Sequence, residues 1–485
     1  MVINRSIKFY LLAFPVGLMG LVQAVFALLS LLVFHDHEET QFFIPAASML
    51  MVSVFLFSFS NQQRLEKITP ADSMLFATLT WVLVGLLGAL PIIEVTGVSL
   101  TDGVFESVSA LTTTGATVLS NLDGMPKSFL LYRQFLQWLG GLGVVIFVVA
   151  VLPVLNVGGM KLLRAETPGP IKDDKVSPRV ASSAHYLWVV YISISIACTI
   201  CYYLVGMSFY DAIAHSFTTV STGGFSTHDA SLGYFKSGAV LIVSDIFMLM
   251  GAISFALHFR NARQFNLMSY WRDEETRYFL LTIVLISGVI FYVFMSQDVY
   301  TDYFEGFNQA LFHLISFITS TGYGAAAYTE WPMVVIALLV LSGYLGGCAG
   351  STAGGNKFIR NILFIKIIGV VLTRINYPNA ITRVRFQSHP VEESVLSATV
   401  AFLSVVVATA LILILMMMAT GLDFWSAFTA VSACLNVVGP AFGSLGNNFQ
   451  PVSDVGTWIL SASMILGRLE YFTVLALLLP EFWRS

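Results

Sequence analysis

Four short polar segments of this sequence each follow an apolar run and contain a glycine, a combination that suits backbone coordination of a cation. The third is the clearest, because the apolar run 312–318 leads directly into the segment 319–324, Thr-Ser-Thr-Gly-Tyr-Gly. Non-helical backbone at membrane depth persists only where it lines a cavity or is buried in protein. Carbonyl oxygens exposed by such a segment can replace the water shell of an alkali cation.

The other three segments align with the third when their glycines are placed in register. They are 112–117 (Thr-Thr-Thr-Gly-Ala-Thr), 221–226 (Ser-Thr-Gly-Gly-Phe-Ser) and 436–441 (Asn-Val-Val-Gly-Pro-Ala). The aligned glycines, called anchor glycines below, are Gly115, Gly224, Gly322 and Gly439. Gly223 is the alternative anchor in the second segment. We choose Gly224 because Asp211 then precedes its anchor by the same number of residues as Asp102 precedes Gly115. A recurrence of roughly 100 residues is too long for a solenoid unit and suits two membrane helices with a segment between them.

The composition places most of the chain in a membrane. Of 485 residues, 56% are hydrophobic and 11% charged, and the mean hydropathy is +0.80, so the apolar surface must face lipid. The net charge of −4 and the lack of a basic tract give no indication of nucleic-acid binding. The first apolar run, 9–34, is far longer than a signal-peptide core and is expected to remain as a transmembrane helix.

Apolar runs predict ten transmembrane helices, and shorter segments between them predict four re-entrant half-helices. The long runs are 8–34, 42–60, 71–95, 129–155, 184–207, 237–259, 278–297, 331–350, 395–420 and 456–480. The short ones are 103–113, 211–221, 306–319 and 424–436, too short to cross about 30 Å as helices. We therefore predict an all-α polytopic membrane protein. Its predicted parts are two leading helices (1–68) and four helix–half-helix–helix repeats around a pseudo-fourfold pore (69–160, 161–262, 263–385 and 386–485).

Charge supports one orientation of these helices. With both termini in the cytoplasm, most Lys and Arg fall on the cytoplasmic side, as the positive-inside rule expects. The exceptions are Lys127, Arg133, Lys236 and Arg468. The opposite side is acidic and is expected to include Asp102, Glu106 and Asp211, where negative charge would concentrate cations near a pore mouth.

In this arrangement, the half-helices direct the partial negative charge of their C-termini toward a central cavity. After each half-helix, the chain returns outward through a glycine segment. Glycine allows the positive φ that turns a carbonyl inward, and the hydroxyls at Thr112, Ser221 and Thr319 add ligands or brace the loop. Hard oxygen donors with little carboxylate suit an alkali cation better than calcium. The predicted filter carbonyls belong to Leu111, Thr112, Thr113, Gly115, Val220, Ser221, Thr222, Gly224, Ile318, Thr319, Ser320, Gly322, Leu435, Asn436, Val437 and Gly439.

These segments, together with the glycine-rich run 346–355 and Arg468, resemble the Trk/Ktr/HKT superfamily of potassium transporters, and within it the bacterial TrkH family. The resemblance covers essentially the whole chain. It implies potassium as the transported ion, no organic cofactor in this chain, no enzymatic activity, and a bacterial inner-membrane location. It also implies a homodimer with a TrkA-like cytoplasmic subunit that binds nucleotides. The basic connections 160–180 and 357–392 are the expected docking surface for that subunit.

Two further features predict a gate. The segment 343–355 contains six glycines, each costing about 1 kcal/mol relative to alanine in a helix, so a continuous helix is not expected there. The alternative is a small-residue packing face. Arg468 is placed near the middle of the last helix, where a charge costs about 2.5–3.5 kcal/mol and needs a partner. The predicted gate residues are Gly346, Gly350, Ser351, Thr352, Gly355 and Arg468.

Three alternatives remain. A proton- or sodium-coupled symporter would need broken helices at matched positions, whereas only the third repeat is predicted to have a broken inner helix. A sodium-preferring member of the superfamily has serine in place of the first-loop glycine, whereas this chain has Gly115. An intramembrane enzyme would use His185, His215 or His313, which lack the spacing of a metal or acid–base site. Asp245 and Glu470 are intramembrane acids without an assigned role.

Overall fold

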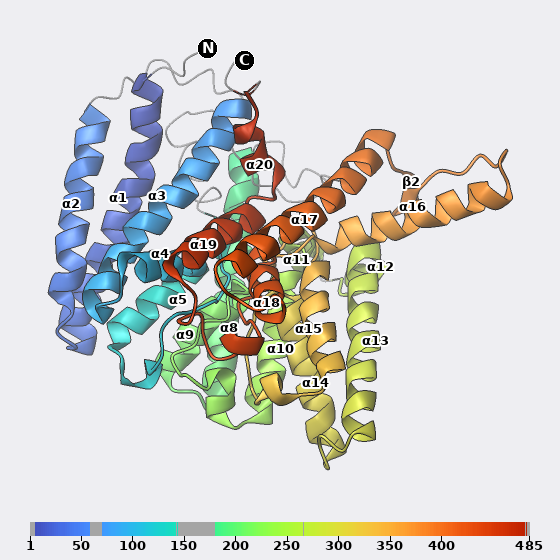
Figure 1. The fold of residues 1–485 in the computed structure, drawn as a ribbon. Helices are drawn as coiled ribbons and strands as arrows, with labels where there is room; N and C mark the ends of the chain where they lie inside the picture. The colour runs from blue at the N-terminus through green and yellow to red at the C-terminus, as the bar shows by residue number, and fades with distance from the viewer. Residues whose placement is uncertain are drawn as a thin grey trace.

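The described part of the chain is almost entirely helical (Figure 1). The computed structural model describes residues 5–58, 70–141, 143, 180–264, 266–480 and 482. A two-residue antiparallel hairpin, β1 (Arg385–Phe386) with β2 (His389–Pro390), is a small exception to the predicted all-α fold.

The two leading helices pack closely along one another at one edge of the bundle (Figure 1). They are α1 (Arg5–Leu29), which continues as a π-helical turn over Ser30–Phe34, and α2 (Glu39–Ser58). Glycine permits the close approach, because a Cβ built on Gly17 would lie 2.5 Å from the hydroxyl oxygen of Ser53. The start of α1 and the C-terminal α20 lie at the same end of the bundle (Figure 1).

The remaining helices follow in the order that the apolar runs predict. They are α3 (Pro70–Thr96), α4 (Leu100–Leu111), α5 (Lys127–Gly141), α8 (Val180–Leu204), α9 (Phe209–Val220), α10 (Gly238–Ala252), α11 (Phe255–Gln264), α12 (Met268–Arg272), α13 (Glu274–Ser296), α14 (Tyr303–Ile318), α15 (Met333–Leu345), α16 (Phe358–Asn376), α17 (Glu393–Ala419), α18 (Phe424–Leu435), α19 (Asp454–Arg468) and α20 (Phe472–Leu475). Short 3-10 turns occur in the connections. Helices α16 and α17 project from one side of the bundle (Figure 1).

Several of these helices can cross a membrane. Among the described residues, six are long and apolar enough by length and composition, or up to eight if each of two bent pairs counts as one span. The count of ten therefore remains a prediction. The predicted helix 129–155 is described as a helix only as far as Gly141. The connection 160–180, apart from its last residue, and the proposed boundaries near 68 and 160 lie outside the described residues.

Inner helices are broken in more than one predicted repeat, so the expectation that only the third is broken is wrong. Helices α10 and α11 are bent by 102° at their break, and α19 and α20 by 108°. No glycine or proline marks residues 253–254 or 469–471, which is why the sequence did not reveal these breaks. Tertiary contacts supply the reason at α10, because the N–H groups of Cys348 and Thr352 bind carbonyls at its C-terminus. A ladder of helical hydrogen bonds is therefore replaced by contacts from another segment.

Candidate ion filter and gate

Four short helices enter the bundle beside the four glycine segments. Helices α4, α9 and α18 have 12 residues each and α14 has 16. At 1.5 Å per residue, 12 residues span about 18 Å, well short of a membrane core of about 30 Å. Their N-cap side chains, each of which accepts a hydrogen bond from a backbone N–H in the first turn, are Ser99, Ser208, Asp302 and Asp423. Each cap satisfies one of the free donors of its helix.

The backbone after these helices repeats one unusual conformation four times. The anchor glycines have φ of +81°, +78°, +79° and +99°, in chain order. Gly223 is not among the residues with positive φ, which agrees with Gly224 as the anchor. The residue two before each anchor is also left-handed, although none is glycine: Thr113, Thr222, Ser320 and Val437. Three of them, Thr113, Thr222 and Val437, are β-branched, and left-handed β-branched residues are strained and persist only where the surroundings impose them, as at functional sites.

The four loops form a closed ring of contacts. A Cβ built on Gly115 would lie 2.2 Å from the carbonyl oxygen of Gly223, and one on Gly224 would lie 1.8 Å from that of Thr321. A Cβ on Gly322 would lie 2.0 Å from the Val438 oxygen. The corresponding distance from Gly439 to the Thr114 oxygen is 2.5 Å, which returns to the first loop. Each anchor glycine thus lies against the carbonyl that precedes the anchor of the next loop, and no side chain fits there.

Hydroxyl and amide side chains at the helix ends brace the loops. The Oγ1 atoms of Thr112 and Thr319 each donate to a carbonyl one turn back in their own helix, both at 2.7 Å. Asn436 does the same through Nδ2 at 2.9 Å. Of the two roles predicted for these hydroxyls, bracing is the one that the hydrogen bonds show, and the backbone carbonyls remain the candidate ion ligands.

A second set of side chains binds the residues that follow the anchor glycine in the first three loops. The residue nine before the anchor is Glu106, His215 or His313 in the first three segments. Glu106 accepts from the Val118 N–H at 3.1 Å, and the His313 Nε2 accepts from the Ala325 N–H at 3.2 Å. His215 Nε2 lies 2.9 Å from the Ser226 hydroxyl. These contacts assign His215 and His313 to the loops, and the side chain of His185 lies outside the described residues.

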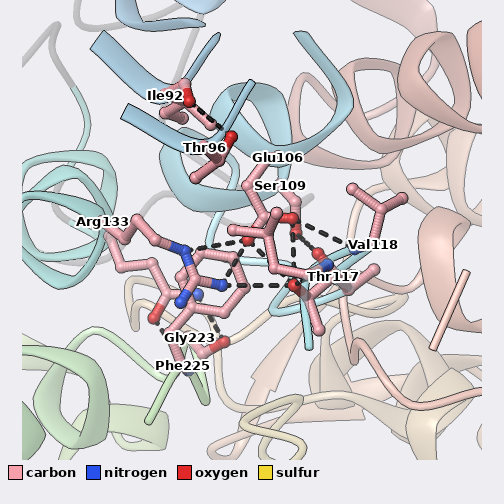
Figure 2. Close-up of polar contacts among 12 residues, drawn as sticks. Ile92, Thr96, Glu106, Ser109, Thr117, Val118, Arg133, Gly223 and Phe225 are labelled. Atoms are coloured by element: carbon pink, nitrogen blue, oxygen red, sulfur yellow. Dashed lines mark hydrogen bonds and ion pairs between the residues drawn. The ribbon is translucent and has the colours of Figure 1, made fainter. Parts of the chain in front are cut away.

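The prediction that Glu106 belongs to an acidic outer face is wrong. Its side chain is fully buried and forms an ion pair with Arg133, which is 1% exposed (Figure 2). Arg133 was an exception to the charge topology, and the pair explains why a basic residue is tolerated there. The fold brings together α4 and α5, and sequence spacing alone could not indicate this contact.

Glycines of the inner helices form a further part of the site that the sequence analysis missed. A Cβ on Gly140 of α5 would lie 1.7 Å from the Leu111 carbonyl oxygen. A Cβ on Gly467 of α19 would lie 2.1 Å from that of Leu435. In both cases the inner helix lies directly against the last residue of a half-helix. The available signal was a glycine near the end of the apolar helix that follows each half-helix.

The predicted gate segment is an irregular loop, Gly346 to Lys357, between α15 and α16. Three glycines, Gly346, Gly350 and Gly355, have positive φ in it, as expected for a segment that cannot be helical. Ser351 lies in the same loop, and its carbonyl accepts from the Lys357 ammonium at 3.3 Å.

This loop contacts three of the four glycine segments. The Thr352 hydroxyl lies 3.4 Å from the hydroxyl of Thr222, in the second, and 3.1 Å from the carbonyl oxygen of Val220 just before it. The Gly354 N–H donates to the Ser320 hydroxyl at 2.6 Å, in the third. The Gly355 N–H donates to the carbonyl of Asn436 at 3.1 Å, in the fourth. The loop therefore lies directly beneath the ring.

Arg468 completes the connection to the first unit. Its guanidinium donates to the carbonyl of Thr352 at 2.9 Å and to those of Gly140 and Gly141 at 2.6 and 2.9 Å. The expectation that Arg468 lies in the middle of a helix is wrong, because it is the last residue of α19. The chain turns sharply after it through Glu470 and Tyr471, both with positive φ.

Two acids bind the loop and the start of α16. Glu275 of α13 accepts from the backbone N–H groups of Ala349 and Ile359, at 2.9 and 3.0 Å. Glu470, to which no role was assigned, forms an ion pair with Arg360 of α16 at 2.6 Å. One Oδ atom of Asp245 is buried without a hydrogen-bond partner, and no function follows from it.

An ionic contact close to the second glycine segment predicts a pH dependence. His228 lies between Asp123, with which it shares a hydrogen bond through Nδ1, and Asp211, 3.5 Å from its Nε2. Burial lowers the pKa of His228, but the hydrogen bonds and charges of Asp211 and Asp123 outweigh burial and raise it above 6.5. The protonated form therefore stabilises the fold fully below the unfolded pKa, and this stabilisation is lost as pH rises through the raised pKa. Because Asp123 is half exposed, we expect a loss on the order of 1 kcal/mol.

Thermal unfolding of the detergent-solubilised chain at pH 6 and at pH 8.5 measures this effect. The native chain should have the lower midpoint at pH 8.5, and His228→Gln should reduce the difference between the two. Lys236→Gln, which removes an exposed charge from the same connection, is the control. A pH difference that persists unchanged in His228→Gln would contradict the assignment.

Four capped short helices that bring four glycine loops into one ring, within a bundle of apolar helices, define a membrane transport protein. The chain belongs to the TrkH family of cation transport proteins, whose sequence model matches residues 37–483. It is 41% identical over 481 residues to the Trk system potassium uptake protein TrkH of Vibrio parahaemolyticus, covering 97% of this chain and 99% of that one. It is 42% identical over 430 residues to the Escherichia coli K12 protein of the same name, covering 88% of each.

A solved structure agrees with this assignment. The crystal structure of the potassium transporter TrkH from Vibrio parahaemolyticus superimposes with a TM-score of 0.89. The two chains are 38% identical in that comparison, which covers 99% of each.

Proposed function

We propose that this chain takes up potassium ions through a single-chain pore with a filter of backbone carbonyls. The closed ring of anchor glycines carries the proposal, because it brings four loops of one conformation around a common centre. Four half-helices with their C-termini at these loops would add negative potential there. Carbonyls at the predicted positions, from Leu111 to Gly439, would replace the water shell of the ion.

The loop 346–357 and Arg468 form the gate in this proposal. The loop contacts the second, third and fourth filter segments, and Arg468 ties it to α5, which belongs to the unit of the first segment. A guanidinium below the filter would also repel an approaching cation. Opening would require the loop to leave these contacts, so the described conformation corresponds to a closed pore.

The proposed setting is the bacterial inner membrane, with ten transmembrane helices and both termini in the cytoplasm. Regulation is assigned to a TrkA-like nucleotide-binding subunit that docks at the basic connections. Of the two basic connections, the structure describes 357–392. Three arginines of this connection are exposed: Arg374, Arg383 and Arg385. Loss of co-purification with that subunit on changing these three arginines to glutamate would support the surface, and full retention would exclude it.

We also propose a homodimer. The exposed apolar side chains on the projecting helix α16, among them Ile365 and Ile375, would be covered by a second copy or by lipid. The mass of the detergent-solubilised particle by light scattering separates these two possibilities, because only a dimer doubles the protein mass.

A proton- or sodium-coupled symporter is the second candidate. The bends at α10–α11 and α19–α20 favour a symporter, because coupled carriers use broken helices and the sequence predicted only one such break. Flux into liposomes that contain the purified chain alone tests both, with K⁺, Rb⁺, Na⁺ and Li⁺ compared. Passive downhill flux of K⁺ and Rb⁺ supports the pore. Flux that requires a proton or sodium gradient supports the carrier.

A further inference from the structure

We propose that the buried Glu106–Arg133 pair is a positioning device for the filter, which holds the first loop against the second and so contributes to the selection of K⁺ over Na⁺. The inference rests on the proposed function, and it assigns roles to two charged residues outside the predicted filter. Neither residue supplies a predicted ion-coordinating carbonyl. Each acts through the backbone that it holds.

The pair binds the residues of the first loop that follow its anchor glycine. The Arg133 Nε donates to Glu106 Oε1 at 2.9 Å, and its Nη2 contacts the same oxygen (Figure 2). The Thr117 hydroxyl lies 3.0 Å from each carboxylate oxygen, and the Val118 N–H donates to Oε2 at 3.1 Å. One carboxylate therefore fixes the two residues that follow Ala116, just above the anchor Gly115.

The same helix, α5, also binds the second loop. The Arg133 guanidinium carbon lies 4.1 Å from the centre of the Phe225 ring, next to the anchor Gly224. Gln137, one turn further along α5, donates to the Gly223 carbonyl at 2.7 Å and accepts from the Phe225 N–H at 3.1 Å. Residues spaced by four lie on one face of a helix, so a single face of α5 binds two adjacent filter loops.

The ion pair distinguishes the first loop from the other three. At the same position, the second and third loops have His215 and His313, and the fourth has Ala430, where Thr429 binds Phe442 instead. A buried charge pair has a defined geometry, and removing one partner leaves an uncompensated charge. We therefore expect the first loop to depend on its brace more than the others.

Selectivity is the property that such a brace would affect, because a carbonyl filter distinguishes ions of similar charge by the positions and number of its oxygens. The carbonyl of Thr114 lies against Gly439, and that of Gly223 against Gly115. A shift of the first loop would be transmitted to both neighbours through these contacts.

The experiment compares Glu106→Gln, Arg133→Gln and the double variant in liposomes, with K⁺ and Na⁺ flux measured under the same gradients. Each single variant should reduce the K⁺:Na⁺ flux ratio by about tenfold. The double variant should be no worse than the singles, because the two residues act as one unit. Glu274→Gln, which breaks the ion pair with Lys366 away from the filter, is the matched control and should keep the native ratio.

The thermal unfolding midpoint of each variant separates a general loss of stability from an effect on the filter. A lowered midpoint with a native flux ratio would overturn the proposal. If either single variant does not fold, Thr117→Val removes the bridging hydroxyl without removing a charge. That variant should lower the ratio by about threefold, and a native ratio would equally overturn the proposal.

Gly115→Ser in the same assay separates this inference from the proposed filter. If Gly115→Ser changes the flux ratio and the pair variants do not, the positioning role is wrong and the filter stands. If Gly115→Ser also leaves the ratio unchanged, the filter itself is placed wrongly.

Discussion

Gly115→Ser is expected to lower the K⁺:Na⁺ flux ratio by at least tenfold. The new Cβ would lie 2.2 Å from the Gly223 carbonyl oxygen, and the oxygen belongs to backbone that cannot move without shifting the second loop. The φ of +81° adds strain of about 1–3 kcal/mol for a residue with a side chain. A free-energy difference of about 1.4 kcal/mol changes an equilibrium tenfold. The strain energy is of this size, so a loop shift that relieves it can change the ion preference of the filter.

Gly206→Ser is a control matched for backbone conformation. Gly206 has a φ of +105°, but a Cβ there would meet no atom within 4 Å. It should therefore share the conformational strain of Gly115→Ser without displacing a filter carbonyl, and its flux ratio should be native. Equal ratios for Gly115→Ser and the native chain would show that selection takes place elsewhere, as in a coupled carrier.

Arg468→Ala is expected to raise passive K⁺ flux through the isolated chain by about ten- to a hundredfold. The guanidinium donates hydrogen bonds to three carbonyls, of Thr352, Gly140 and Gly141, and so ties the gate loop to α5. Hydrogen bonds to a charged group contribute about 1.5–3 kcal/mol each, so losing even one of them shifts the closed–open equilibrium by that range. Cells that carry the variant should also retain potassium poorly.

Arg374→Ala is the comparison for this experiment. Arg374 is exposed near the end of α16, where it donates to Thr382, and its loss should leave flux by the isolated chain unchanged. Arg468→Lys keeps the charge but cannot reach three carbonyls in the same way, so it should give intermediate flux. Native flux from Arg468→Ala would mean that this residue does not hold the gate closed.

The local parts of the site could be predicted from the sequence, because they depend on residue types at short spacing. A short apolar helix that ends in hydroxyl residues and glycine predicts a half-helix followed by a loop with positive φ, and Gly115 and Gly322 have that conformation. The six glycines of 343–355 predict a break between two helices, and α15 ends at Leu345. Membrane insertion was evident from the apolar runs alone, because their length matches the bilayer.

The predictions that were wrong, and the site residues that were missed, depend on contacts between residues far apart in the chain. Glu106 looked like an exposed acid because its partner Arg133 lies on another helix. Arg468 looked mid-helical because the apolar run continues beyond it and a single glycine, Gly467, does not by itself end a helix, whereas the structure turns the chain through Glu470 and Tyr471.

The four segments share few identical residues, and only the tertiary structure places each anchor glycine against the next loop. Local sequence determines which backbone conformations are accessible to each segment. Which of them lie together is decided by packing, since a ring of carbonyl contacts forms only when all four loops are present.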